Sequence, residues 1–592
     1  NDSESFALND KILFFGQSPH TWHYTVSENS FEHRKNIYSD TTYYFLCFDL
    51  GPGKRIPKES VNLDPSVDYL STTYDSHFFH EDDLYNLINS GRQFFGESFS
   101  FNQFQNYNYN LENIDINSPI KLNARFAARS TTYSSFNVIY NQENVSSITI
   151  NPVSSTSSSP YYVAKEADVV FNPNSTDLNL TFSYNNNNNS SAMSWLDYFS
   201  VVYRNKLFFN GSQFVFRDVN SLDLTTKYIM SSSSNNIQVL DVTDPINIFE
   251  VDLDETSSGI EFKSNSINGL LRQFVVFNNN DNLTPRYSGL VPNQNIHGSS
   301  DPSYIIVTHP NFIDAASRLA NFHTENYHEN VLLVTTDEVY NEFSTGSQDV
   351  TAIRNLVKFF YDRSNNIPKN LLLFGDASYD YKNITSSNTN FVPTFQSYRS
   401  DNIKLSYCTD DFFGMLDNFE GSSNSIVSDL IDIGIGRLTV VDNIEAENVV
   451  NKIINYSNNS FGDWKNKVCF VSDDVDEAWE ESLLIHADAL ATKVDTNYNW
   501  INVDKIYSDA FQQESTAGGE RYPDVNNKIV DLINSGVLIV NYIGHGGEVG
   551  WASERILGLT EINNFKNSEK LPVFVTATCE FSRFDDPERV SA

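Results

Sequence analysis

The chain has 592 residues, of which 40% are hydrophobic and 14% aromatic, so it is long enough for several domains with apolar cores. It carries 39 lysine and arginine residues against 76 aspartate and glutamate residues, a formal net charge of −37. This balance argues against binding to nucleic-acid phosphates and against adhesion to anionic lipid. The four cysteines form no CxxC motif and no disulfide scaffold, and no run of eighteen apolar residues predicts a membrane-spanning helix.

Residues 1 to about 300 have the pattern of β structure. Short apolar or alternating runs recur, among them KILFFG (11–16), TYYFLCFDL (42–50), FNVIYN (136–141) and LNLTFSY (178–184). Polar clusters rich in Asn, Ser and Pro separate these runs and are typical of loops. We therefore predict two all-β domains of the sandwich or barrel type, at residues 1–125 and 126–295.

From about residue 300 onward, apolar strands alternate with amphipathic helices. Strands are expected at 303–309, 330–336, 370–376, 432–437, 467–474, 536–546 and 571–579. Helical spacing of apolar residues predicts helices at 350–363, 445–457, 477–494 and 524–536. In the last helix Asp524 and Gly536 are expected to cap the two ends. This alternation predicts an α/β domain with a mainly parallel sheet at residues 296–592.

Two residues with catalytic potential follow the last two predicted strands. His545 lies among three glycines in NYIGHGGEVGW, and Cys579 ends the run LPVFVTATC thirty-four residues later. Neighbouring parallel strands lie about 4.8 Å apart and ligands gather at their carboxyl ends, so the imidazole and the thiol are expected to meet. A histidine that takes the proton of a thiol produces a nucleophile for acyl transfer. We expect the N–H groups of Gly546 and Cys579 to form an oxyanion hole.

A carboxylate is needed to orient such an imidazole, and the end of the strand at 467–474 offers several. Asp473, Asp474 and Asp476 all lie at the sheet edge where His545 and Cys579 are expected. The alternative interpretation is that Cys579 is a buried, inert thiol and that His545 is only a turn residue.

Calcium is the ion for which the sequence offers candidate ligands outside the catalytic residues. GDASYDY (375–381) and TDDFFG (409–414) each gather carboxylates, and oxygen ligands of this kind suit Ca²⁺. The same clusters are equally typical of solvated loops. We expect no cofactor in catalysis and no catalytic metal, and Ca²⁺ only as a structural ion.

Several long motifs resemble the gingipain-type cysteine peptidase family. They are LLLFGDASYDYKN (371–383), YCTDDFFGMLD (407–417), DIGIGRLTV (432–440), DKIYSDAF (504–511), NYIGHGGEVGWASERIL (541–557) and LPVFVTATCEFSRFDDP (571–587). The resemblance covers about 300–592 and implies a caspase-like α/β catalytic domain preceded by the all-β domains. It also implies that Cys579 is the nucleophile and His545 the catalytic histidine. The supporting acid falls on Asp474, with Asp473 as the alternative.

Two features depart from the family pattern. The acidic residue that gives Arg-gingipains their S1 specificity for basic side chains falls near Leu483, so cleavage after arginine is not expected. The chain also ends thirteen residues after Cys579, whereas the family's domain continues. We therefore expect the C-terminal part of the protein to be missing from this chain.

Within that family the motifs are most similar to the sortases of the type IX secretion system. This implies action at the outer face of the outer membrane of a Bacteroidota-type bacterium. Such an enzyme removes the C-terminal sorting domain of cargo proteins and joins the new C-terminus, through a thioester, to a lipopolysaccharide-type acceptor. The implied partners are the cargo, the outer-membrane barrel PorV and, as further candidates, PorQ and PorZ, but no nucleic acid. The alternatives are a secreted gingipain-type endopeptidase and an inactive surface scaffold protein.

Overall fold

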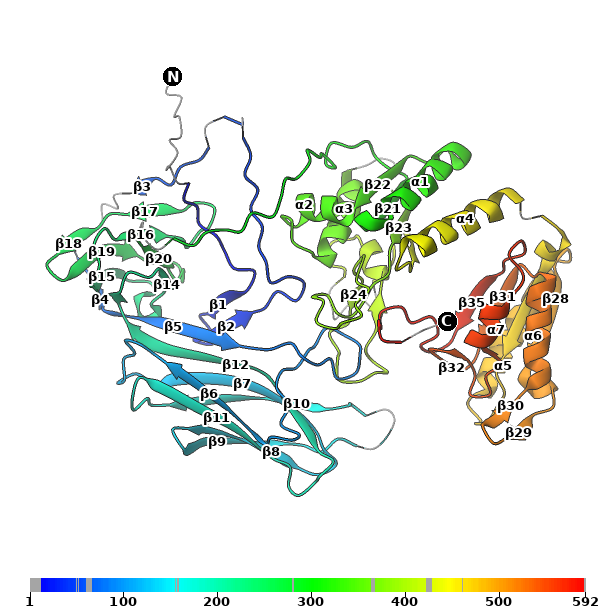
Figure 1. Cartoon of the computed structure of the whole chain (residues 1–592), viewed down its shortest axis with the longest axis horizontal. Coiled ribbons are helices and arrows are strands. Elements are labelled where there is room, and N and C mark those ends of the chain that lie inside the picture. The colour runs from blue at the N-terminus through cyan, green and yellow to red at the C-terminus, as the bar shows by residue number, and fades with distance from the viewer. Residues whose placement is uncertain are drawn as a thin grey trace. The chain divides into compact units, whose positions relative to one another are not determined.

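The computed structural model describes residues 12–589 except 49, 52, 60–65, 155, 157–158, 279–281, 364–367, 422–428 and 460. The chain divides into two compact units (Figure 1). Unit 1 comprises Asn1–Asn293 and Tyr398–Tyr407, and unit 2 comprises Gln294–Ser397 and Cys408–Ala592. No helix of the described residues combines the length and the apolar content that a membrane span requires.

Unit 1 contains a first sandwich of two four-stranded antiparallel sheets. One sheet has the order β10-β7-β12-β5, with strands at Val163–Phe171, Ile120–Arg129, Met193–Lys206 and Thr73–His80. The other has the order β6-β11-β8-β9, with strands at Phe104–Asn110, Asp177–Asn185, Ser134–Tyr140 and Glu143–Ile150. Alternate side chains along these strands are buried, so the inward faces enclose one apolar core, in which Phe126 stacks on Phe136 and meets Phe182 edge to face.

A second sandwich in unit 1 consists of shorter strands. One sheet has the order β13-β15-β19-β18, with strands at Phe208–Phe209, Thr225–Ser232, Gly259–Asn265 and Asp254–Thr256, and β4 (Tyr69–Ser71) pairs with β15. The other has the order β14-β20-β16-β17-β3, with strands at Phe214–Phe216, Phe274–Phe277, Gln238–Asp241, Phe249–Val251 and Lys58–Glu59. Phe216, Tyr228 and Phe274 pack together in its core. A separate hairpin of β1 (Thr21–Thr25) and β2 (Ser30–Arg34) completes the unit.

The first sandwich is inserted into the second. β4 leads directly into β5, and β12 leads directly into β13. Thr73 and Lys206 are partners in the antiparallel pairing of β5 with β12, so the chain enters and leaves the inserted sandwich at adjacent points. This arrangement differs from the predicted division into residues 1–125 and 126–295, because the border at 125/126 falls inside β7. A single cut in the sequence cannot separate the sandwiches, since the second takes strands from both sides of the first.

The first sheet of unit 2 is parallel throughout and has the order β22-β21-β23-β26. Its strands are Val331–Thr335, Tyr304–Thr308, Asn370–Phe374 and Gly434–Leu438, and its helices are α1 (Ile313–Tyr327), α2 (Thr336–Phe343), α3 (Val350–Arg363) and α4 (Asn443–Asn459). The chain steps from β21 to β22 and then back past β21 to β23. Because parallel crossovers are right-handed, this reversal places α1 and the α2–α3 pair on opposite faces.

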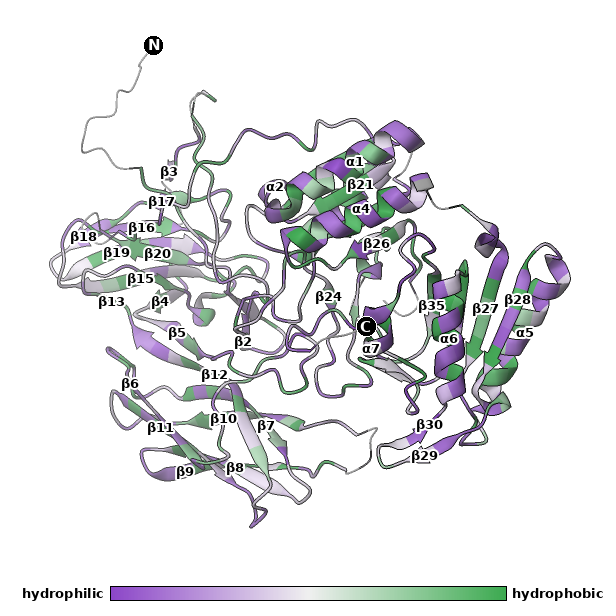
Figure 2. Cartoon of the chain, turned by 45° about the vertical axis from the view of Figure 1, so that its right-hand side comes forward, coloured by the Kyte–Doolittle hydropathy of each residue, from purple (hydrophilic) through white to green (hydrophobic). Residues whose placement is uncertain are grey.

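The second sheet of unit 2 is also parallel and has the order β28-β27-β31-β35. Its strands are Asn502–Tyr507, Lys467–Ser472, Ile539–Ile543 and Val573–Ala577, and its helices are α5 (Glu481–Asn497), α6 (Pro523–Ser535) and α7 (Leu559–Asn564). Alternate residues of β27 face opposite helices: Phe470 packs with Ala491 of α5, and Val471 belongs to the core shared with Ile529 of α6. Burial on both faces explains why β27 is almost wholly apolar (Figure 2).

Short hairpins complete unit 2 at Phe395–Gln396 with Cys408–Thr409 (β24, β25), at Glu514–Thr516 with Gly519–Arg521 (β29, β30), and at Gly546–Gly547, Gly550–Trp551 and Leu557–Gly558 (β32 to β34). The predicted caps of α6 are half correct. Gly536, with φ of 102°, ends the helix as predicted. Asp524 does not cap its start, because Pro523 begins the helix and Tyr522 occupies the N-cap position.

Candidate active site

The carboxyl ends of three neighbouring strands carry the residues singled out from the sequence. The last paired residues of β27, β31 and β35 lie side by side and are Ser472, Ile543 and Ala577. Asp474, His545 and Cys579 each follow two residues later on their own segment. The strand order reverses here, since the chain moves from β27 to β28 on one side and then to β31 on the other. Open α/β sheets place their ligands at such a switch point.

The main chain of His545 is fixed on both sides. Its N–H donates to Oδ2 of Asp473 at 2.9 Å. Its carbonyl oxygen accepts from the Tyr542 hydroxyl at 2.5 Å and from the Ala552 N–H at 2.8 Å. Tyr542 is fully buried and stacks on Trp551 with the ring centroids 4.3 Å apart. These contacts hold the residue at the strand end while 44% of the imidazole side chain remains exposed.

The imidazole is paired with a residue that the sequence analysis missed. Nε2 of His545 lies 2.8 Å from Oε1 of Glu480, whose side chain is only 8% exposed. The second carboxylate oxygen, Oε2, accepts the backbone N–H groups of Glu477 at 2.7 Å and of Asp476 at 2.9 Å. The hydrogen bond from Glu477, together with that from His545, holds the pKa of Glu480 below its usual value. Glu480 is therefore an oriented carboxylate that can stabilise an imidazolium.

The position of Glu480 explains why it was missed. It lies inside the helix predicted at 477–494, where a glutamate is expected on the solvated face. In the structure α5 begins only at Glu481, and the residues before it turn back toward the strand ends. The neighbouring Trp479 packs edge-on against the His545 ring, with centroids 5.5 Å apart. An acidic residue just before a helix that follows a strand end is the signal that would have pointed to Glu480.

The two aspartates expected to orient the imidazole have other partners. Asp473 accepts the backbone N–H groups of His545 and of Asp474, the latter at 3.1 Å. Asp474 accepts from the Tyr522 hydroxyl at 3.1 Å and from the Gln513 amide at 3.3 Å. The structure thus places Glu480, rather than Asp474 or Asp473, at the ring. The short aspartate side chains directly after β27 accept hydrogen bonds from groups at the sheet edge. The longer side chain of Glu480 reaches the His545 ring from the residue before α5.

Gly544 and Gly546 are glycines because the chain is crowded at both positions. A Cβ at Gly544 would lie 2.4 Å from the hydroxyl of Tyr542. A Cβ at Gly546 would lie 2.3 Å from Oγ1 of Thr578 and 3.2 Å from the carbonyl oxygen of Cys579. The segment that carries the histidine therefore lies directly against the segment that carries the cysteine.

The ladder of the β32–β33 hairpin sets the direction of the Gly546 N–H. The Ala552 N–H donates to the His545 carbonyl just beyond the paired residues, at the place where the ladder would have its next hydrogen-bonded pair, although the His545 N–H itself donates to Asp473. Since such pairs alternate with non-hydrogen-bonded ones, Gly546 and its partner Trp551 direct their N–H groups away from each other. The Gly546 N–H is thereby turned out of the hairpin, as a donor to an oxyanion must be. Its role in an oxyanion hole with the Cys579 N–H stays a prediction.

Cys579 is exposed and begins a tight turn. The N–H of Phe581 donates to its carbonyl oxygen at 2.7 Å, and Glu580 and Ser582 have φ values of 52° and 63°. The chain therefore folds back directly after the cysteine, which leaves the thiol at the end of β35.

The other cysteines differ from Cys579, although all four are free thiols. Cys469 is fully buried within β27, and this burial raises its pKa to about 12. Burial also raises the pKa of the Cys408 thiol well above its ordinary value. Cys47 is exposed but belongs to unit 1. Cys579 alone combines exposure with a place beside the His545 segment.

Comparison with known proteins agrees with this geometry. The model of peptidase family C25 matches residues 297–592, which is 296 of the 592 residues. The chain belongs to peptidase family C25. It is therefore a member of a cysteine peptidase family.

Relatives of this C25 chain include solved and curated proteins. The crystal structure of dimeric latent PorU from Porphyromonas gingivalis is similar with a TM-score of 0.67 and 27% identity, covering 76% of this chain and 44% of that one. Gingipains R2 and R1 of the same bacterium are 25% identical over 154 residues, which are 25% of this chain and 19% and 14% of theirs. The chain thus spans less than half of PorU and less than a fifth of the gingipains. The predicted fold class, a gingipain-type α/β domain preceded by all-β domains, is confirmed.

The two acidic loops that offer candidate calcium ligands form hydrogen bonds and ion pairs within the C25 domain. In the loop at 375–381, Asp380 accepts the N–H of Thr385 at 2.7 Å. In the loop at 409–414, Asp410 is paired with Arg437 at 2.7 Å. Among the described residues, neither loop contributes to a group of His, Cys, Asp or Glu side chains close enough to share an ion. A calcium ion in these loops stays a prediction.

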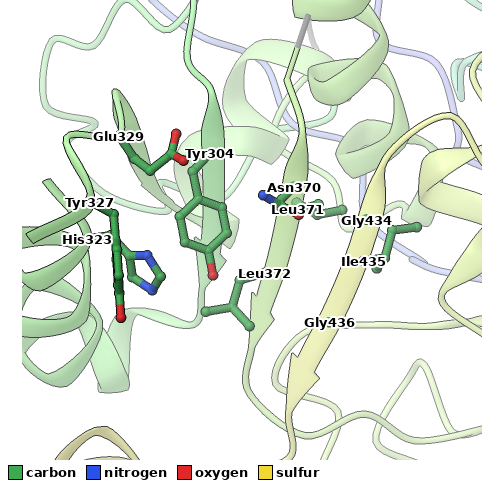
Figure 3. A pocket seen from close by; sticks show the side chains of 10 residues that line it. All are labelled: Tyr304, His323, Tyr327, Glu329, Asn370, Leu371, Leu372, Gly434, Ile435 and Gly436. Carbon is green, nitrogen blue, oxygen red and sulfur yellow. The ribbon is translucent and has the colours of Figure 1, made fainter. Parts of the chain in front are cut away.

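The C25 domain also has a pocket of about 680 Å³, formed by residues of its first sheet and of α1 (Figure 3). It is lined by Tyr304, Asn370 and Gly434, the first residues of β21, β23 and β26, and by His323 and Tyr327 of α1. The pocket is thus at the amino end of the first sheet, whereas His545 and Cys579 follow the carboxyl ends of the second. It is not part of the candidate active site.

Proposed function

We propose that the chain carries the catalytic domain of a cell-surface cysteine peptidase that acts as a transpeptidase, the sortase of a type IX secretion system. The observation that carries this proposal is the placing of His545 and Cys579 just beyond the paired ends of β31 and β35, with Glu480 on the imidazole. Membership of family C25 supports the cysteine peptidase chemistry, and the similarity to PorU supports the sortase class.

In the first step, the Cys579 thiol gives its proton to Nδ1 of His545, because Nε2 is paired with Glu480. The sulfur attacks the scissile carbonyl carbon of a cargo protein, and the N–H groups of Gly546 and Cys579 stabilise the oxyanion. When the C–N bond breaks, the imidazolium protonates the leaving nitrogen and the C-terminal sorting domain departs. The cargo remains on the sulfur as a thioester.

In the second step, a primary amine of a lipopolysaccharide-type acceptor attacks the thioester. The amine proton passes to His545, an amide bond forms and the thiolate leaves, which restores the starting site after proton return. Glu480 stabilises the imidazolium in both steps. One amide bond is exchanged for another, so the proposed reaction needs no redox partner and no cofactor.

Two observations favour a sortase over an Arg-gingipain. The similarity to PorU covers 76% of this chain, although the C25 model covers only half, so it includes part of the β region. Leu483, near the position expected for the acidic S1 residue, is an apolar, half-buried residue of α5. An acidic S1 pocket that binds arginine is therefore not part of the proposal.

The proposed place of action is the outer face of the outer membrane of a Bacteroidota-type bacterium. The proposed partners are cargo proteins with C-terminal sorting domains, the barrel PorV, and the accessory proteins PorQ and PorZ. They follow from the sortase proposal. The net charge of −37 favours such partners over nucleic acid.

A hydrolytic endopeptidase is the second candidate, because the site is open to water. The His545 side chain is 44% exposed and Cys579 is exposed, so water can reach a thioester at this position. The two functions differ only in the nucleophile of the second step.

The test uses the full-length protein, a cargo-derived substrate with its sorting domain, and a primary amine added over a concentration series. A sortase gives more amide product as the amine increases, whereas hydrolysed product at every amine concentration favours the endopeptidase. Cys579→Ala abolishes both products, and Cys47→Ala, which removes another exposed thiol, retains them. Normal processing by Cys579→Ala would contradict both functions.

A further inference from the structure

A buried arginine follows the cysteine turn and reaches the histidine segment. Arg583 lies four residues after Cys579, and its side chain is only 10% exposed. Nη1 of Arg583 lies 3.2 Å from Oε1 of Glu548, and its Nε lies 2.9 Å from Oδ1 of Asp585. Glu548 belongs to the turn between β32 and β33, three residues after His545. One guanidinium group thus joins the segment of the cysteine to the segment of the histidine.

The chain beyond the cysteine turn is anchored on loops that follow the first sheet of the C25 domain. Oδ2 of Asp585 accepts from the side-chain amide of Gln396 at 3.0 Å, and its carbonyl oxygen accepts the Tyr379 N–H at 2.9 Å. Gln396 belongs to β24, and Tyr379 lies in the loop after β23. The guanidinium of Arg437, in β26, lies 5.2 Å from the centre of the Phe584 ring. The arginine that reaches the histidine segment is therefore held between two fixed neighbours.

Burial gives the contacts of Arg583 a defined geometry. The side chains of Glu548 and Asp585 are only 16% and 1% exposed. A guanidinium presents its donors in a rigid planar fork, so binding two carboxylates at once fixes their relative positions. Arg589 also contacts Glu548, at 3.1 Å, but its side chain is 55% exposed and water screens that pair. Arg583 is therefore the stronger of the two restraints on Glu548.

The histidine hairpin needs such a restraint at its tip. The turn lies between Gly547 and Gly550, which offer no side chains for packing. Proton transfer from a thiol to an imidazole needs the two groups within hydrogen-bond reach, so small displacements of the hairpin are costly. We propose that Arg583 is a positioning residue, which holds the hairpin of His545 against the turn of Cys579 through Glu548. This inference rests on the proposed function in one respect, because it takes His545 as the base for Cys579.

Alkylation of Cys579 tests the proposal in the full-length protein without a peptide substrate. Iodoacetamide reacts with thiolates, and mass spectrometry of the digest gives the rate for each cysteine. Arg583→Gln is expected to slow alkylation of Cys579 about tenfold near pH 7, because the imidazole is displaced. Near about pH 10 a free thiol ionises without a base, so there the variant should react as the wild type does. A loss of access to the thiol would instead lower the rate at every pH.

Glu548→Ala separates positioning from simple charge effects. Loss of the Arg583 charge would by itself disfavour a thiolate, whereas loss of the Glu548 charge would favour one. Positioning requires that both variants slow alkylation near neutral pH. Faster alkylation in Glu548→Ala, or a wild-type profile in Arg583→Gln, would overturn the proposal. Arg521→Gln is the matched control, since its guanidinium donates to the carbonyl groups of its own β29–β30 hairpin, and it should react as the wild type does.

His545→Ala distinguishes failure of this inference from failure of the proposed function. If His545→Ala slows alkylation of Cys579 but Arg583→Gln and Glu548→Ala do not, the positioning role is wrong and the catalytic pair stands. If His545→Ala itself keeps the wild-type profile, the thiol–imidazole chemistry of the proposed function is wrong, and the positioning role falls with it. Slower alkylation in all three variants supports both.

Discussion

Nε2 of His545 lies 2.8 Å from Oε1 of Glu480, and this contact joins the end of β31 to the start of α5. The backbone N–H groups of Asp476 and Glu477 hold the other oxygen of the same carboxylate. The orientation of the imidazole therefore depends on where α5 begins. It also depends on the loop that connects this helix to β27.

Glu480→Gln is expected to lower kcat/KM by about 10²-fold, because the amide keeps the size of the side chain but cannot stabilise an imidazolium by charge. Steady-state kinetics with a cargo-derived substrate would measure the effect. The matched control is Glu481→Gln, which changes the exposed next residue at the start of α5 and should retain activity. Wild-type kinetics for Glu480→Gln would show that the carboxylate plays no part in catalysis.

Gly546→Ala is expected to reduce activity by about 10²-fold and to destabilise unit 2 by about 1–3 kcal/mol, because its Cβ would lie 2.3 Å from Oγ1 of Thr578. Gly547→Ala is the control, since no atom lies within 4 Å of a Cβ at that position. Urea unfolding and kcat/KM should be measured for both variants. If the two variants behaved alike, close packing of the histidine and cysteine segments would be disproved.

Two buried histidines at the β1–β2 hairpin are expected to make the stability of unit 1 depend on pH. His33 stacks on Phe79 with ring centroids 3.7 Å apart, and Trp22 lies 4.2 Å from His77. Nδ1 of each histidine is buried without a hydrogen-bond partner. Burial lowers the pKa of His33 to about 4 and that of His77 to about 3. Both rings are therefore neutral when the hairpin is docked.

An unfolded histidine has a pKa of about 6.5, so the unfolded chain binds more protons than the folded one below that pH. The contribution of the neutral, buried histidines to the free energy of unfolding is fully present above about pH 6.5. It is lost as the pH falls toward about 4, and for His33 the loss is on the order of 2 kcal/mol. Hydrogen exchange of the hairpin amides across this range would measure it. His33→Phe should flatten the profile and His486→Phe, in unit 2, should leave it unchanged; a flat wild-type profile would contradict the prediction.

Arg204 neutralises two buried carboxylates in unit 1. It contacts Asp75 at 2.9 Å and Asp218 at 2.7 Å, and the Asp218 side chain is fully buried. Arg204→Met is expected to destabilise the unit by about 3–5 kcal/mol, because two charges would lose their partner. Chemical denaturation should show this loss, with Lys206→Met, an exposed change two residues further along β12, as the control. Unchanged stability of Arg204→Met would mean that these carboxylates are protonated.

Much of unit 2 could be predicted from periodicity. Each of the seven strands predicted there overlaps an observed strand, because burial on both faces produces apolar runs such as those of β27 and β31. β28 was missed, since NVDKIY is an edge strand whose only fully buried side chain is Ile506. The positions of His545 and Cys579 follow from the strand ends. Their catalytic roles remain predictions that the kinetic experiments must decide.

Other features depend on contacts that local patterns do not encode. Glu480 reaches His545 only because α5 begins at Glu481, and helix boundaries are the part of a structure that periodicity defines least. The pairing of Thr73 with Lys206 joins positions that are far apart in the chain, and nothing in either short segment specifies its distant partner. The predicted domain border at 125/126 was wrong because this pairing of distant segments cannot be read from the local sequence.

That pairing also makes the inserted sandwich a self-contained module. β5 and β12 pair at the base of the inserted sandwich. The end of β4 and the start of β13 therefore lie close enough for a short loop to join them. A tight turn or another domain with adjacent termini could replace the module without stretching the outer sandwich. During synthesis β3 and β4 emerge before the inserted module, but their partners β17 and β15 emerge only after it. We therefore expect the outer sandwich to complete its folding after the inserted sandwich.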